Sequence, residues 1–182
     1  MRPAAFLDRD GTLNRDTDFV GGPEEVELLP GAAEAVRRLR AAGFVPVVVS
    51  NQSGVARGYF DERTVRAVNR RLGELLAAAG APIELWYWCP HLPEGRDPRY
   101  AVACDCRKPA PGLLLRAARE HALDLARSVA IGDRERDIEA ARAAGVPVTV
   151  LLAPRAPLTT RATHVAPDLA AAADWLLARL RP

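Results

Sequence analysis

Two acidic residues, Asp8 and Asp10, stand two positions apart at the end of a short apolar run near the start of the chain. In an extended strand, residues spaced in this way project to the same face, so both carboxylates would enter one small space before the turn at Gly11 and Thr12. Paired carboxylates suit Mg²⁺, which takes one or two carboxylates together with substrate phosphate. One acid can then act as a nucleophile while the other transfers protons.

Two other interpretations of this segment need weighing. An EF-hand calcium loop begins with the same letters, but it requires Asp or Asn at its fifth position, where this chain has Thr12. A solvated Asp-Gly turn without chemistry is the remaining alternative.

Rare residue types elsewhere point to a tight polar site. Lys108 is the only lysine among 25 basic residues, and Gln52 is the only glutamine. An ammonium is a compact charge that a planar guanidinium does not replace in a confined space. The retained lysine therefore predicts a functional role, with chance survival as the alternative.

All three cysteines lie in one short stretch that also contains a histidine: Cys89, His91, Cys104 and Cys106. Three thiolates and an imidazole are a usual tetrahedral Zn²⁺ set, and a site with four protein ligands is structural rather than catalytic. Such a tie would order a loop longer than compact domains usually tolerate and would hold Lys108 close behind it. The alternatives are free buried thiols or a strained Cys104–Cys106 disulfide, and His121 and His164 are expected to be structural or surface residues.

The elements that must position these residues alternate along the chain. Apolar runs predict strands at residues 3–7, 44–49, 83–88, 128–131 and 148–152, with a short edge strand at 164–165. Helical periodicity predicts helices at residues 31–42, 61–79, 111–122, 134–144 and 168–180. This alternation predicts a Rossmann-like, three-layer α/β/α domain over residues 1–182, whose parallel sheet binds ligands at the carboxyl ends of its strands.

Composition excludes several classes of protein. The net charge is only +2 and no basic run is interleaved with aromatic residues, so no nucleic-acid partner is expected. The chain lacks an apolar stretch long enough for a signal peptide or a membrane helix, and an odd cysteine count argues against a secreted disulfide framework. We expect a cytoplasmic monomer without a membrane partner.

Four motifs occur in a fixed order: Asp8-Arg9-Asp10-Gly11-Thr12, Ser50 after the second strand, Lys108 before a helix, and Gly132-Asp133 followed by Asp137. Together they resemble the haloacid dehalogenase superfamily of phosphohydrolases. The resemblance implies that Asp8 attacks phosphorus to form an aspartyl phosphate and that Asp10 is the general acid and base. It also implies Mg²⁺ at Asp8, the Asp10 backbone carbonyl and Asp133, with Asp137 orienting the metal shell. Ser50 and Lys108 would hold the phosphoryl oxygens.

Longer stretches, Ser50–Gly58 and the segment from Cys89 to Pro109, resemble the narrower family of heptose-1,7-bisphosphate 7-phosphatases and the related histidinol-phosphate phosphatases. This implies removal of the 7-phosphate from a small phosphorylated sugar, for nucleotide-activated heptose synthesis, in a domain without a cap and with a zinc-bound loop at residues 89–106. The substrate contacts it implies are Asp16, Thr17, Asp18, Phe19, Ser50, Asn51, Gln52, Ser53, Arg57, Arg107, Lys108 and Arg134.

Asp18-Phe19 stands where the family often has Gly-Tyr, which leaves a histidinol-phosphate phosphatase or a broad phosphatase of small metabolites as alternatives. A zinc-stabilised binding module is the alternative that is not an enzyme.

Overall fold

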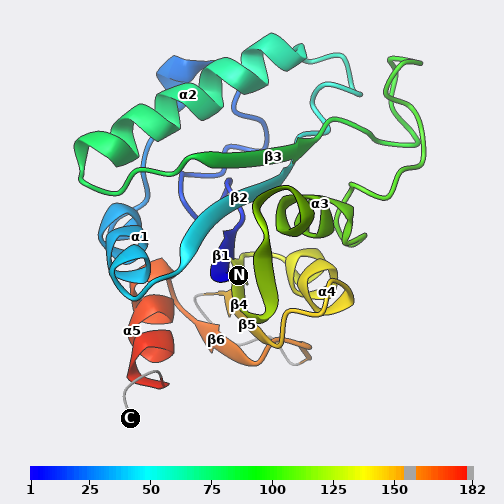
Figure 1. The fold of residues 1–182 in the computed structure, drawn as a ribbon. Helices are drawn as coiled ribbons and strands as arrows, with labels where there is room; N and C mark the ends of the chain where they lie inside the picture. The colour runs from blue at the N-terminus through cyan, green and yellow to red at the C-terminus, as the bar shows by residue number, and fades with distance from the viewer. Residues whose placement is uncertain (154–158, 180–182) are drawn as a thin grey trace.

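A parallel sheet forms the centre of the computed structural model, which describes residues 1–153 and 159–179. Within these ranges six strands lie in the order β3-β2-β1-β4-β5-β6, and every neighbouring pair is parallel (Figure 1). The strands are β1 (Arg2–Leu7), β2 (Val45–Asn51), β3 (Leu85–Cys89), β4 (Leu123–Gly132), β5 (Val148–Leu152) and β6 (His164–Ala166).

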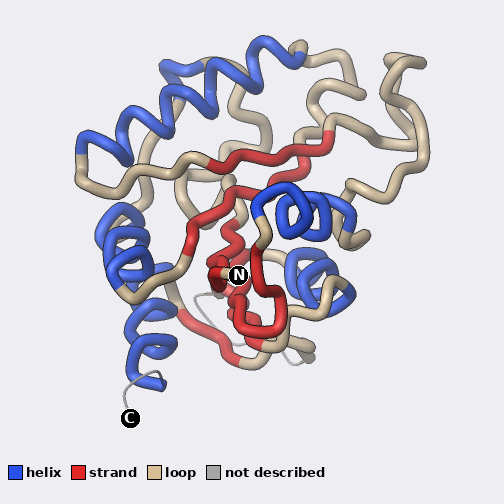
Figure 2. Tube along the Cα trace, viewed as in Figure 1, coloured by secondary structure: helices blue, strands red, loops and turns tan. Residues whose placement is uncertain are grey.

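Helices cover both faces of the sheet because the strands carry apolar side chains on both sides. Ala5 and Leu7 of β1 join the apolar cluster beneath α1 (Ala32–Ala41), α2 (Glu62–Ala78) and α5 (Leu169–Arg179). Ala4 and Phe6 face the opposite way, into the cluster beneath α3 (Gly112–His121) and α4 (Glu135–Ala143) (Figures 1 and 2). The three-layer α/β/α prediction is therefore confirmed.

The predicted elements differ from the structure mainly at their ends. β4 begins at Leu123 instead of residue 128, because Leu123 and Asp124 pair with Arg2 and Pro3 before an irregularity in the register. A short 3₁₀ helix at Pro23–Glu25 was not predicted. The last residue of the predicted helix 168–180 lies outside the described residues.

The strand order places a switch point at the middle of the sheet. From β1 the chain builds outward through β2 and β3 to one edge, and then through β4, β5 and β6 to the other. In such sheets the crevice at the carboxyl ends of the two central strands receives the ligand. Here those strands are β1, which leads into Asp8, and β4, which leads into Asp133.

The segment from residue 90 to residue 111 connects β3 to α3 without regular secondary structure (Figure 2). It contains three of the four residues predicted to bind zinc, and Lys108 lies near its end. No helix in the described part of the chain is both long and apolar enough to cross a membrane.

Candidate active site

Lys108 lies at the centre of a cluster of oxygen atoms. Its Nζ is 2.6 Å from Asp8 Oδ1, 2.7 Å from Asp137 Oδ1 and 2.6 Å from the backbone carbonyl of Val49, and its side chain is only 4% exposed. Asp133 completes the group, since oxygens of Asp8, Asp133 and Asp137 all lie within 4.8 Å of one another. The fold therefore brings together acidic and ammonium groups from three distant parts of the sequence.

The ends of β1 and β4 must approach closely to form this cluster. The Asp8 backbone N–H donates to the Ile131 carbonyl at 3.0 Å, so the two strands stay paired up to the point where their acidic residues emerge. A Cβ atom at Gly11, where φ is +80°, would lie 2.6 Å from Asp133 Oδ2. A Cβ atom at Gly132 would lie 2.5 Å from Asp137 Oδ2. Both positions consequently require glycine.

Burial controls the electrostatics of the cluster. It raises the pKa of Asp8 to about 7, with the charge of Lys108 opposing the rise and Asp137 and Asp10 adding to it. Burial alone would lower the pKa of Lys108, but Asp8 and Asp137 outweigh it and hold that pKa above its usual value. Burial and Asp137 also raise the pKa of Asp133, against the effect of Arg134. Asp8 and Asp137 share the Lys108 ammonium, and Asp133 pairs with the exposed Arg134 at 2.9 Å. Three carboxylates against these two cations form an oxygen-rich, net negative site, which is the donor set that a hard divalent cation prefers.

Asn51 fixes the backbone on which Lys108 stands. Its side-chain amide donates to the Lys108 carbonyl at 3.0 Å and accepts from the Lys108 N–H at 3.0 Å. The neighbouring Arg107 donates to the His91 carbonyl at 3.1 Å. The end of β2 and the cysteine-rich loop therefore hold the lysine from two sides.

A cavity of about 300 Å³ opens beside this cluster. The lining residues are Asp8, Asp10, Asp16, Asp18, Phe19, Val20, Asn51, Gln52, Ser53, Arg57, Arg107, Asp133, Arg134 and Arg136. All but Val20 and Arg136 are predicted site residues. Arg136 comes three residues after Asp133, and this closeness to the Gly132-Asp133 motif is the feature of the sequence that could have indicated it.

Four of the residues predicted for the phosphatase site do not line the cavity. Ser50, Lys108 and Asp137 are buried, and the Ser50 hydroxyl accepts a hydrogen bond from Gln52 Nε2 at 2.6 Å. Thr17 is exposed.

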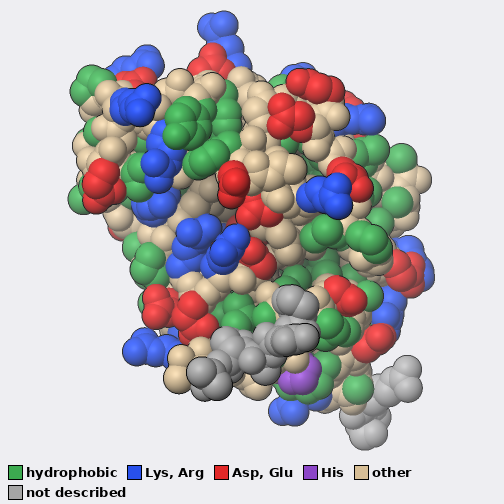
Figure 3. Space-filling view, turned by 180° about the vertical axis from the view of Figure 1, so that it is seen from behind, with side chains coloured by type: hydrophobic (Ala, Val, Ile, Leu, Met, Phe, Trp, Pro, Cys, Tyr) green, Lys and Arg blue, Asp and Glu red, His purple; other side chains and the backbone are tan. Residues whose placement is uncertain are grey.

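In Figure 3 acidic and basic side chains lie next to one another near the middle of the face in view.

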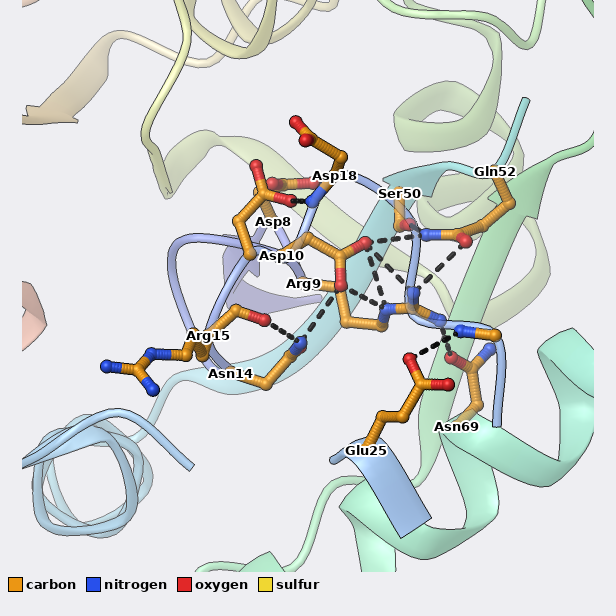
Figure 4. Close-up of polar contacts among 12 residues, drawn as sticks. Asp8, Arg9, Asp10, Asn14, Arg15, Asp18, Glu25, Ser50, Gln52 and Asn69 are labelled. Carbon is orange, nitrogen blue, oxygen red and sulfur yellow. Dashed lines mark hydrogen bonds and ion pairs between the residues drawn. The ribbon is translucent and has the colours of Figure 1, made fainter. Parts of the chain in front are cut away.

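Arg9, Asn14 and Asn69 form a polar network with Asp10 that the sequence did not predict (Figure 4). They are far apart in the sequence or of common types, so no local pattern marks them. Arg9 lies between the two acids of the Asp8–Thr12 motif, which indicates no role for it.

The predicted zinc ligands converge at one point. The sulfur atoms of Cys89, Cys104 and Cys106 are 3.1 to 3.5 Å apart, and His91 Nδ1 is 3.3 Å from Cys106 Sγ and 3.6 Å from Cys89 Sγ. A tetrahedral site with Zn–S bonds of about 2.3 Å places its sulfur atoms about 3.8 Å apart, a few tenths of an ångström more than these distances.

The thiol chemistry of this cluster also suits zinc. The three cysteines are free, so the alternative Cys104–Cys106 disulfide is not formed. The hydrogen-bonded contact between Cys106 and Cys89 lowers the pKa of Cys106 to about 5, whereas the same contact and burial raise the pKa of Cys89. One thiolate is thus available to begin metal binding.

Comparison with known proteins finds a matching family model and relatives that are named as heptose-bisphosphate phosphatases. A family model described as HAD-hydrolase-like matches residues 105–172. D-glycero-beta-D-manno-heptose-1,7-bisphosphate 7-phosphatase from Rhodopseudomonas palustris is 49% identical over 146 residues, which cover 80% of this chain and 81% of that protein. The D-glycero-D-manno-heptose-1,7-bisphosphate 7-phosphatase of Thermosynechococcus vestitus is 44% identical over 193 residues, covering 100% and 98%.

A solved structure resembles the whole chain. The crystal structure of D,D-heptose 1,7-bisphosphate phosphatase from B. bronchiseptica, complexed with magnesium and phosphate, superposes with a TM-score of 0.83 at 38% identity. The match covers 97% of this chain and 99% of that one.

Proposed function

We propose that this chain, which belongs to the family of D-glycero-D-manno-heptose-1,7-bisphosphate 7-phosphatases, hydrolyses the 7-phosphate of that heptose bisphosphate. The family lies within the haloacid dehalogenase superfamily. The observation that carries the proposal is the buried Lys108 ammonium, placed between Asp8 and Asp137 and directly behind Asp8, which lines the cavity. A phosphoryl group is strongly anionic, and it can approach the Asp8 carboxylate only where positive charge offsets their repulsion.

Asp8, Asp133 and the backbone carbonyl of Asp10 would hold Mg²⁺, and Asp137 would orient its outer shell. The convergence of three carboxylates supports this assignment, as does the magnesium in the related B. bronchiseptica structure. When bound, Mg²⁺ neutralises charge on the phosphoryl oxygens.

The residues of the chain divide the chemistry between two steps. In the first, an Asp8 carboxylate oxygen bonds to phosphorus, and Asp10 gives a proton to the leaving sugar oxygen as its bond to phosphorus breaks. In the second, Asp10 takes a proton from water as the water oxygen bonds to phosphorus, and Asp8 is released. Lys108 remains charged through both steps and offsets the negative charge beside Asp8.

Basic side chains around the cavity would hold the rest of the bisphosphate. Arg57, Arg107, Arg134 and Arg136 all line it, and Arg57 Nε is buried without a hydrogen-bond partner in the described residues. Arginine suits this task because its planar fork binds phosphate at two points. Further contacts are proposed for the cavity residues Asp16, Asp18, Phe19, Asn51, Gln52 and Ser53, whereas Thr17 and Ser50 would need to turn toward the substrate.

Zn²⁺ would be held by Cys89, His91, Cys104 and Cys106 in a structural role. Their spacing supports a site with four protein ligands, which leaves no position for a substrate. The metal would order the loop that leads into Arg107 and Lys108.

Phosphorus NMR of the reaction tests the proposal. Purified protein with Mg²⁺ is incubated with the heptose 1,7-bisphosphate, and we expect the 7-phosphate signal to be replaced by inorganic phosphate while the 1-phosphate signal persists. Asp8→Asn should fold normally and release no phosphate. Faster turnover of histidinol phosphate, or loss of the 1-phosphate first, would contradict the assigned substrate.

A further inference from the structure

Arg9 is a buried guanidinium with a hydrogen-bond partner at each nitrogen. Only 1% of the residue is exposed, and each of its three side-chain nitrogens has an acceptor. Nε donates to Asp10 Oδ1 at 3.1 Å, and Nη1 donates to Asn69 Oδ1 at 2.9 Å. Nη2 donates to both Asp10 Oδ2 at 2.9 Å and Gln52 Oε1 at 3.0 Å.

The same contacts fix the side chain of Asp10. Gln52 Nε2 donates to Asp10 Oδ2 at 2.9 Å, and Asn14 Nδ2 donates to Oδ1 at 2.9 Å. Both carboxylate oxygens are therefore held from more than one direction, and Figure 4 shows the carboxylate turned toward Arg9, Asn14 and Gln52. Asp10 cannot rotate without breaking several hydrogen bonds.

We propose that Arg9 is a positioning residue that aims Asp10 at the leaving oxygen, and that Asn69 holds Arg9 in place. The inference rests on the proposed phosphatase function. Arg9 does not line the cavity, so it acts through Asp10 instead of touching the substrate. Asn69 lies on α2, outside the catalytic cluster, and is 7% exposed.

The geometry requires arginine at this position. One planar fork spans acceptors on three residues, whereas a lysine ammonium offers a single point of contact. An aspartate held by such a fork presents its oxygens in one orientation, and proton transfer to a leaving oxygen depends on that orientation.

The dependence on the leaving group tests this role. The sugar oxygen needs a proton to leave, but the phenolate of p-nitrophenyl phosphate does not. We expect Arg9→Gln to lower kcat/KM for the heptose bisphosphate by about 100-fold or more, which is within the usual contribution of proton transfer. The loss with p-nitrophenyl phosphate should be at least about tenfold smaller.

Asn69 provides a matched pair of variants that also covers the case in which Arg9→Gln does not fold. Asn69→Leu removes the acceptor for Arg9 and should reproduce the selective loss in weaker form. Asn69→Asp keeps an oxygen at the same place and should recover most of it. Arg40, which bonds to Pro82 and Glu84 away from the cavity, supplies the control: Arg40→Gln should leave the ratio of the two kcat/KM values unchanged.

The outcomes separate this inference from the proposed function. Equal losses on both substrates in the folded Arg9 and Asn69 variants would mean that Arg9 is merely structural. If the unaltered protein releases phosphate from neither substrate, the proposed function itself is wrong.

Discussion

At the scale of single residues, the numbers of positive and negative side chains determine what the site can bind. One ammonium serves Asp8 and Asp137, with Asp133 close by, inside a largely buried cluster. Burial of the Asp8 and Asp137 carboxylates would cost much more free energy without the Lys108 ammonium between them. The cluster still has more negative than positive groups, so it favours a bound cation, whose charge would in turn offset that of a phosphoryl group.

Lys108→Arg tests whether the shape of the cation matters as well as its charge. Three oxygens surround Nζ at 2.6 to 2.7 Å, which leaves no room for a planar guanidinium. We expect kcat to fall by about 10² to 10³, the usual loss when a donor to the transition state is misplaced. Steady-state kinetics measure this loss. Arg38→Lys is the control, because the half-buried Arg38 forms an ion pair with the exposed Asp174, outside the catalytic cluster. Full activity in Lys108→Arg would show that any cation suffices.

The raised pKa of Asp8 predicts that magnesium binding depends on pH. The pKa is raised to about 7, so below pH 7 a proton occupies the carboxylate and Mg²⁺ must displace it. The apparent Mg²⁺ affinity should therefore fall about tenfold per pH unit below 7 and level off above it. Thermal melts with increasing Mg²⁺ at several pH values measure this through the shift in Tm. Equal midpoint concentrations at pH 6 and pH 8 would contradict it, and Asp8→Asn should abolish the pH-dependent part.

At the scale of elements, the ends of strands and the loop after β3 supply different parts of the site. β1 and β4 deliver the acids through a close approach that Gly11 and Gly132 permit. β2 delivers Asn51, whose amide holds the backbone of Lys108. The loop carries the lysine itself, so its order determines whether the cation reaches the acids.

Removal of a zinc ligand should therefore reduce both stability and activity. We expect His91→Asn to lose bound zinc, to melt at a lower temperature and to lose activity in parallel, because structural zinc contributes free energy to folding. His121→Asn is the matched control, since His121 contacts Tyr87 and lies outside the cysteine cluster. Metal analysis and thermal melts decide it; His91→Asn with full zinc content would show that His91 is not a ligand.

At the scale of the whole molecule, two apolar clusters on opposite faces of the sheet hold the strands in register. The larger includes residues of α1, α2 and α5, and the other includes residues of α3 and α4. The site lies at one edge of the sheet, outside both apolar clusters. The stability of the fold and the chemistry of the site can therefore be changed separately.

Leu72→Ala tests this separation. Leu72 is fully buried in the larger cluster, and its truncation should lower the free energy of unfolding by about 2 to 5 kcal/mol. Urea denaturation measures the loss, and kcat per folded molecule should be retained. The exposed Leu115 gives the matched control, because its truncation should change stability by less than about 0.5 kcal/mol. A comparable loss of kcat in Leu72→Ala would show that core and site are coupled.

Much of the fold and of the catalytic cluster could be predicted because both follow from local patterns. Asp8, Ser50 and Asp133 come at the ends of apolar strands, and the parallel sheet brings such ends together. Two close pairs of cysteine and histidine ligands likewise indicated zinc without any knowledge of the fold.

The remainder depends on contacts between distant residues. Asn69 meets Arg9 only because the fold brings α2 to the loop that follows β1, and nothing in the neighbourhood of Asn69 in the sequence indicates this. The early start of β4 is set by its pairing with Arg2 and Pro3, again a property of the partner strand.

The burial of the sole lysine has a practical consequence for labelling. Reagents that acylate side-chain amines have one such target in this chain, and in the folded protein it is closed off behind Asp8 and Asp137. Modification of that amine, read by mass spectrometry, therefore reports how often the catalytic centre opens, and bound phosphate should slow it.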